Sequence, residues 1–157
     1  MNRFDPIVPS VYVYSYIQML NIFDYNDDEI SQLSGVTLSP ELAKEGAFSI
    51  DEVLRLVKTS YQITEMPHLG LIVGSMLGAG FHGFGGLAAM TQSNCREGLK
   101  AASRFTESAF PALNAQTFDT DTQTGIRMLV SMTLDPYLPF FLESIMMSYC
   151  NTLHYIH

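Results

Sequence analysis

The chain has 157 residues, a length typical of one domain. It carries 16 acidic and 8 basic residues, for a formal net charge of −8. Tight nucleic-acid binding needs a cluster of Lys and Arg that replaces phosphate counterions, and the sequence has none, so we expect no direct nucleic-acid binding by this chain. Charged residues make up only 15% of it, which predicts that a second subunit or another part of the protein covers some of the surface.

The cysteines and the ends of the sequence predict a cytoplasmic protein. Cys95 and Cys150 lie far apart and lack CxxC spacing, which is typical of reduced intracellular thiols. Residues 1–9 include Arg3 and Asp5 and lack the apolar run of a signal peptide. The longest nearly charge-free stretch, 66–95, is interrupted by glycine and polar residues, so we expect no membrane span.

The first half of the chain predicts helices with clear ends. Pro9-Ser10 opens a helix, because proline is favoured at a helix start. Residues 27–33 form a second helix, and Gly35 serves as its C-cap. Ser49 and Glu52 have the spacing of a capping box, which predicts a third helix from that point.

Three further helices are predicted between Pro67 and about Thr106. Pro67 starts one helix, and the glycines of 78–80 stop it. Residues 83–90 form a short helix that is apolar on all sides, so we expect it to be buried. Asn94, with a glutamate three residues later, predicts a capping box and a helix that runs to about Thr106.

The remaining residues predict a hairpin and a final helix. Strands are expected at 113–119 and 126–134, joined by a loop at 121–125, and a last helix runs from the prolines near 136 to about His154. The fold class is therefore α+β, with a helical layer packed on a small antiparallel sheet and a long C-terminal helix. Two strands alone make a marginal sheet, so we expect that a partner supplies more strands or that the chain is a fragment.

Six short motifs occur in an order that resembles a known family. They are Val8-Pro-Ser-Val-Tyr, Leu33-Ser-Gly-Val, Phe48-Ser-Ile-Asp-Glu-Val-Leu-Arg-Leu, His68-Leu-Gly-Leu, His82-Gly-Phe-Gly-Gly-Leu-Ala and Leu99-Lys-Ala-Ala-Ser-Arg-Phe. Together they resemble the N-terminal effector-binding, arabinose-binding-like domain of AraC-type transcription regulators, over about Val8 to His154.

The resemblance implies a single sensor domain over residues 1–157, without catalysis. Such a domain binds a small effector, forms a homodimer, or does both, and so controls DNA binding by a C-terminal helix-turn-helix domain that is not among these residues. One alternative is a ligand-free dimerisation module. A second is a heme or gas sensor, although the tyrosine, serine and arginine signature of heme binding does not occur, and we expect no cofactor.

Candidate effector-binding residues are polar or adaptable groups near the glycine-rich segment and on the hairpin. His82, between glycines, would be a polar contact at a pocket mouth, or a turn histidine that bonds nearby backbone. Methionines adapt to irregular apolar surfaces, which favours an apolar or aromatic effector over a sugar, although each also suits an ordinary core. The set is His82, Phe84, Met90, Arg96, Met128 and Met132.

Candidate partner-facing residues lie on two helices. Arg96, Lys100 and Arg104 follow one helix face at i, i+4 and i+8, as a docking stripe or as an ordinary solvated face. Met146 and Met147 lie on the final helix and suit a dimer face. Histidines, cysteines and carboxylates lack metal-ligand spacing, and no nucleophile motif occurs, so we expect neither a metal site nor an enzyme.

Overall fold

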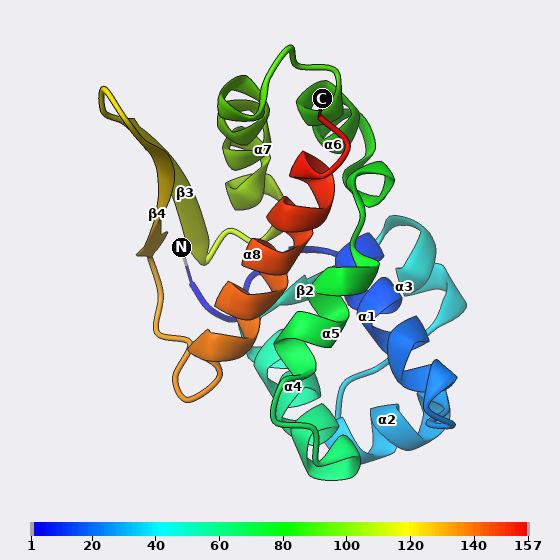
Figure 1. Ribbon diagram of the computed structural model, residues 1–157. Coiled ribbons are helices and arrows are strands. Elements are labelled where there is room, and N and C mark those ends of the chain that lie inside the picture. The colour runs from blue at the N-terminus through cyan, green and yellow to red at the C-terminus, as the bar shows by residue number, and fades with distance from the viewer. Residues whose placement is uncertain (1, 157) are drawn as a thin grey trace. The chain divides into compact units, whose positions relative to one another are not determined.

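The computed structural model describes residues 2–156, with only the backbone at residue 79. Helices predominate in these residues, and the strands form two separate two-stranded antiparallel sheets, which confirms the predicted α+β class. The chain divides into two compact units, Met1–Leu69 with Leu134–Tyr137 (unit 1) and Gly70–Thr133 with Leu138–His157 (unit 2). Figure 1 labels their elements.

Unit 1 is a helical assembly with one very short sheet. Its elements are β1 (Pro6–Pro9), α1 (Ser10–Ile22), α2 (Asp27–Ser34), α3 (Pro40–Glu45), β2 (Ala47–Ser49) and α4 (Ile50–Thr64). Its core contains Leu20, Ile30, Ile50 and Leu56, all fully buried. The antiparallel pairing of β1 with β2 was not predicted, because its partners lie far apart in the sequence.

The predicted helix ends of unit 1 are confirmed by their hydrogen bonds. The Ser49 hydroxyl accepts from the Glu52 backbone N–H at 3.2 Å, and the Glu52 carboxylate accepts from the Ser49 N–H at 2.8 Å, which completes the capping box of α4. Gly35 ends α2 with φ +66°, a left-handed conformation that favours glycine.

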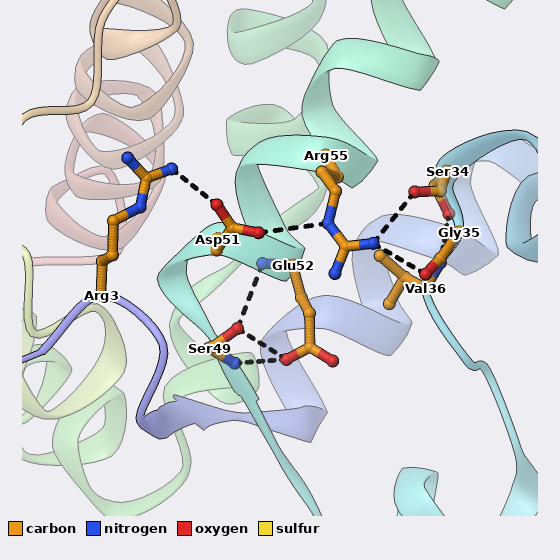
Figure 2. A network of polar contacts seen from close by, with 8 residues as sticks. All are labelled: Arg3, Ser34, Gly35, Val36, Ser49, Asp51, Glu52 and Arg55. Atoms are coloured by element: carbon orange, nitrogen blue, oxygen red, sulfur yellow. Dashed lines mark hydrogen bonds and ion pairs between the residues drawn. The ribbon is translucent and has the colours of Figure 1, made fainter.

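A polar network ties the end of α2 and the start of the chain to α4 (Figure 2). Arg55 Nη1 donates to the carbonyl of Gly35 at 2.7 Å, and so satisfies the negative end of the α2 dipole. Asp51 lies between two cations, with Arg55 Nε at 3.3 Å and Arg3 Nη2 at 2.7 Å. None of these three residues had been selected in the sequence, although two belong to a motif that carries the family resemblance.

Unit 2 holds three helices, a 3₁₀ turn and a hairpin around a long C-terminal helix (Figure 1). Its elements are α5 (Leu69–Met76), which begins at the unit boundary, η1 (Ala79–His82), α6 (Gly83–Met90), α7 (Cys95–Ala109), β3 (Leu113–Asp119), β4 (Thr124–Val130) and α8 (Leu138–Leu153). In Figure 1, α5 lies on one side of α8 and α7 on the other.

Several predicted boundaries of unit 2 differ from the structure. The prediction for β4 was 126–134, but the strand spans Thr124–Val130, and the N–H of Ser131 adds one bond in the same register, to the carbonyl of Ala112. Asn94 caps α7 by accepting from the Glu97 N–H at 3.0 Å. The Glu97 carboxylate bonds to Lys100 at 3.2 Å, whereas the predicted capping box requires it at the Asn94 N–H.

The expectation that α6 is buried on all sides is wrong. Gly85, Gly86 and Ala89 are buried, but Phe84 is 91% exposed and Leu87 is 51% exposed. The small residues pack inward because α7 approaches this face closely, so the two largest side chains of the helix point outward.

The helices in residues 2–156 can be compared with the length and apolar content that a bilayer span requires. No one helix there has both the length and the apolar content to cross a bilayer. A bent pair, 69–76 with 80–90, meets these criteria only when both helices are taken together.

Candidate functional site

Polar side chains on one face of α8 bind the backbone carbonyls of α5 and the residue that follows it. The Ser144 hydroxyl donates to the carbonyl of Gly70 at 3.0 Å. The Ser148 hydroxyl donates to the carbonyl of Leu77 at 2.9 Å. Asn151 donates to two further carbonyls of α5, at 3.2 and 2.9 Å. The bonds from Ser148 and Asn151 reach carbonyls at the C-terminal end of α5 and at the residue after it, where a helix leaves its acceptors open, and so they fix that end on α8.

Two glycines allow α5 to approach α8 this closely. A Cβ at Gly70 would lie 2.5 Å from the carbonyl oxygen of Phe140, and one at Gly74 would lie 2.7 Å from the Cβ of Met147. Neither distance admits a side chain without movement of one helix. The contact between α5 and α8 is therefore a rigid element of unit 2.

Ser148 also holds the other end of the loop that follows α5. His82 Nε2 lies 2.7 Å from the Ser148 Oγ, while the Ser148 hydrogen is directed to the carbonyl of Leu77. His82 Nε2–H is therefore the donor in this pair. One hydroxyl thus joins both ends of the segment 77–82, which we call the glycine loop.

The protonation of His82 follows from its surroundings. Burial lowers the pKa of the His82 imidazole, so the ring is neutral at pH 7. In this arrangement Nε2 carries a hydrogen and does not accept the serine proton. The pair therefore lacks the geometry of a nucleophilic serine with its general base.

A second cluster ties the hairpin to α7. The Asp119 carboxylate, at the end of β3, accepts from Arg96 Nη1 at 2.8 Å, from Lys100 Nζ at 2.9 Å and from Thr124 Oγ1 at 2.6 Å. Hydrogen bonds from Lys100 and Thr124 lower the pKa of Asp119, and bonds to Asp119 and Glu97 raise the pKa of Lys100. We call Arg96, Lys100, Asp119 and Thr124 the Asp119 clasp.

The strand register places Met128 on the same side of the hairpin as the clasp. Asp119 pairs with Thr124 and Ala115 pairs with Met128, and alternate residues of a strand share one face. Leu113 and Ala115 lie on that face and are buried. The ion pairs of Asp119 with Arg96 and Lys100 show that the same face is turned toward α7. Met128, which is half-buried, therefore lies on the hairpin face that α7 covers.

The other predicted effector residues occupy different places. Phe84 lies in the first turn of α6 and is exposed. Met90 is the last residue of α6, about 12 Å along the helix from His82 at 1.5 Å per residue. Met132 is half-buried in the segment after β4. The structure places Arg96 and Met128 in the layer between α7 and the hairpin, and His82 against α8.

The predicted partner-facing residues also separate. Lys100 belongs to the clasp, and Arg104 is exposed farther along α7. Met146 is 46% exposed on α8, whereas Met147 is half-buried next to Gly74.

Three residues that organise these contacts were missed in the sequence. Ser148 belongs to a run of buried hydroxyl residues on α8 at i, i+4 and i+8, a spacing that the sequence did contain. The buried Tyr149 hydroxyl bonds to the Thr106 hydroxyl of α7, and burial raises the Tyr149 pKa. Asp119 had no local signal, because its partners lie on another element.

Metal ligands do not cluster in the part of the chain that the structure describes. Within residues 2–156, no group of three or more His, Cys, Asp or Glu side chains has an arrangement that would hold a metal ion.

Comparison with known protein families gives a match over most of the chain. The model of the family described as the N-terminal arabinose-binding domain of AraC transcription regulators matches residues 28–156. No curated protein matches the chain. The matched range begins at α2 and ends after α8, so it includes the glycine loop, the clasp and the hairpin.

Proposed function

Because the chain belongs to the family of N-terminal arabinose-binding domains of AraC transcription regulators, we propose that it senses a small effector and controls DNA binding by another domain of the regulator. The family is one of regulatory ligand-binding domains and not of enzymes. The match over residues 28–156 is the observation that carries the proposal. The net charge of −8 agrees with DNA contact made elsewhere in the protein.

We place the effector in the layer between α7 and the hairpin. The clasp supplies cations there, and Met128 supplies an adaptable apolar surface about 13 Å along β4 from Thr124. An elongated molecule with an apolar or aromatic body and an anionic end matches both. Its anion would compete with Asp119 for Arg96.

The signal would be a shift between two arrangements of the hairpin. With the clasp closed, Asp119 holds the end of β3 on α7. An effector that binds Arg96 favours the open clasp, and its differential affinity for the two states sets the size of the shift.

Thermal unfolding of the chain with benzoate, phenylacetate, cinnamate and L-arabinose tests the proposal. We expect at least one aromatic acid to raise the Tm and arabinose to have no effect. Arg96→Gln should weaken that response by about tenfold, because a charge-assisted bond is lost. Arg127→Gln is the matched control, since Arg127 is exposed on the opposite face of the hairpin.

The negative outcomes separate the alternatives. A chain that no small molecule stabilises would favour a ligand-free interaction module. A Soret band after mixing with heme would favour a heme sensor and contradict the proposed effector class.

A further inference from the structure

One more charged residue borders the Asp119 clasp. Glu97, in the first turn of α7, bonds to Lys100 Nζ at 3.2 Å, and the same nitrogen bonds to Asp119 at 2.9 Å. Lys100 therefore lies between two carboxylates, one on its own helix and one on the hairpin. The side chain of Glu97 is 46% exposed, so it can meet a molecule that approaches from solvent.

The charges of this group of residues balance while the clasp is closed. Arg96 and Lys100 contribute two positive charges, and the carboxylates of Glu97 and Asp119 contribute two negative charges. Arg96 pairs with Asp119 at 2.8 Å, whereas Lys100 pairs with both carboxylates. The two cations therefore depend on Asp119 to different degrees.

Opening of the clasp leaves an excess of one positive charge on α7. When Asp119 moves away with the hairpin, Lys100 keeps Glu97, because both lie on α7 and are three residues apart. Arg96 loses the carboxylate of Asp119. The group that becomes available is thus a guanidinium, whose fork of N–H donors matches the two oxygens of a carboxylate.

We propose that Glu97 makes the site selective for an effector that ends in a single carboxylate and against one that carries two negative charges at the same end. The inference rests on the proposed function, in which an effector replaces Asp119 at Arg96. One negative charge restores the balance that Asp119 provides in the closed clasp. A second charge on the same head would face the Glu97 carboxylate, and like charges at short range weaken binding.

The remaining cation of α7 lies farther along the helix. Arg104 follows Arg96 by eight residues, which corresponds to about 12 Å along the helix axis. An anionic head bound in the place of Asp119, against Arg96 and Lys100, is therefore closer to Glu97 than to the backbone of Arg104. We expect Arg104 to contribute little to the choice between one and two charges.

Dose-dependent thermal unfolding with matched aromatic acids tests the role of Glu97. Benzoate, phenylacetate and cinnamate carry one carboxylate, whereas phthalate and phenyl phosphate carry two negative charges at about pH 8. At constant ionic strength, the wild-type chain should bind its best monoanion about threefold or more tighter than either dianion. Glu97→Gln should remove or reverse this preference, because the open site then carries one more positive charge.

Three variants serve as controls. Glu107→Gln removes the same charge from α7 farther along the helix, and its amide oxygen can still accept from Asn114, so it should leave the ratio of the two dissociation constants unchanged. Glu97→Asp keeps the negative charge and should keep the preference for monoanions. Arg104→Gln should keep it as well. A purely structural role of Glu97 would lower the Tm without ligand and leave the ratio unchanged.

The outcomes separate this inference from the proposed function. If the wild-type chain responds to none of these acids, the proposed effector class fails and the inference fails with it. If an acid binds and Arg96→Gln weakens its binding, but Glu97→Gln leaves the ratio unchanged, only the role of Glu97 is overturned. A wild-type chain that prefers the dianions overturns that role as well.

Discussion

Ser148 shows how one buried residue can organise a segment that is weak by itself. Its hydroxyl donates to the carbonyl of Leu77 and accepts from His82, which are the two ends of the glycine loop. The loop contains glycines with open space around them, since a Cβ at Gly78 or Gly80 would meet nothing within 4 Å. Ser148 therefore supplies a tertiary anchor at both ends of a loop whose glycines make no close contact of this kind.

Replacing Ser148 with alanine should destabilise the protein by about 1–3 kcal/mol, because a part-buried carbonyl and a part-buried imidazole N–H lose their partner. Urea unfolding measures the change in free energy. Ser75→Ala is the control: its hydroxyl is exposed and bonds only within its own helix, to Ile72 at 2.7 Å, so a change within about 0.5 kcal/mol is expected. Equal losses of stability in the two variants would show that the hydrogen bonds of Ser148 to Leu77 and His82 contribute nothing.

His82 should make stability depend on pH. Burial places the folded-state pKa of His82 below its ordinary value of 6.5, so the unfolded chain binds a proton more readily. This contribution to stability is fully present above 6.5 and is lost as the pH falls toward the folded-state pKa. Urea midpoints measured between about pH 8 and about pH 5 should fall less in His82→Gln, whose amide can still donate to Ser148. An identical pH slope in both proteins would contradict this.

At the scale of elements, unit 2 uses two different kinds of contact. The α5–α8 pair is held by close backbone approach at Gly70 and Gly74 and by buried hydroxyl bonds. The hairpin is held on α7 by the exposed charges of the Asp119 clasp. Buried packing is costly to disrupt, whereas exposed ion pairs contribute little and respond to salt. The hairpin is therefore the element that is easier to move.

Gly74→Ala should destabilise the protein by about 1–3 kcal/mol, since the added methyl group forces α5 away from α8. Gly78→Ala is the matched control. Its φ of −74° suits alanine and its surroundings are open, so the change should be neutral or stabilising by about 0.4–1 kcal/mol. Thermal or urea unfolding separates the two, and a neutral Gly74→Ala would disprove the close approach.

Asp119→Asn should loosen the hairpin while leaving the global unfolding midpoint nearly unchanged, because the clasp is exposed. Amide hydrogen exchange should become faster in β3 and β4 and stay unchanged in α8. Asp121→Asn, in the exposed loop of the same hairpin, is the control and should have no effect.

Acid should reproduce the effect of Asp119→Asn. The folded-state pKa of Asp119 lies below its ordinary 3.8, so the clasp stabilises the hairpin above that pH and is lost as the pH falls through the lowered value. Acid should therefore reduce the protection of the hairpin amides, measured relative to their intrinsic exchange rates. This loss of protection should be smaller in Asp119→Asn than in the wild-type chain.

At the scale of the whole molecule, net charge and family membership both bear on which part of the regulator contacts DNA. The chain is acidic, with a net charge of −8, and belongs to a family of regulatory ligand-binding domains. The matched residues, 28–156, include parts of both compact units. Both agree with the proposal that this domain recognises an effector and that another part of the regulator contacts DNA.

A mobility-shift assay at low salt should show no complex between this chain and duplex DNA, because no basic cluster replaces phosphate counterions. A net acidic chain would bind only if Arg and Lys were gathered on one face, and Arg96 and Lys100 are paired with the carboxylates of Asp119 and Glu97. Tight binding that weakens steeply with added salt would contradict this prediction.

Local sequence signals predicted the ends of several helices and of one strand. Ser49 with Glu52, Gly35 and Asn94 each mark a helix end through bonds or backbone conformations that lie within a few residues. The first strand of the hairpin was likewise predicted at its observed bounds, 113–119. Such signals are local, so a single sequence contains all the information they require.

Which side chains meet became clear only from the packing of the elements. His82 and Ser148 lie 66 residues apart, and Arg96 and Asp119 lie 23 apart, so no local pattern pairs them. The composition of α6 predicted a buried helix, yet the Phe105 ring against Gly85 admits only the small face. Packing space and the choice of a distant partner depend on the position of every neighbouring element. The sequence therefore predicted the family and the helices, but not the bonds of Ser148, the Asp119 clasp or the exposure of Phe84 and Leu87.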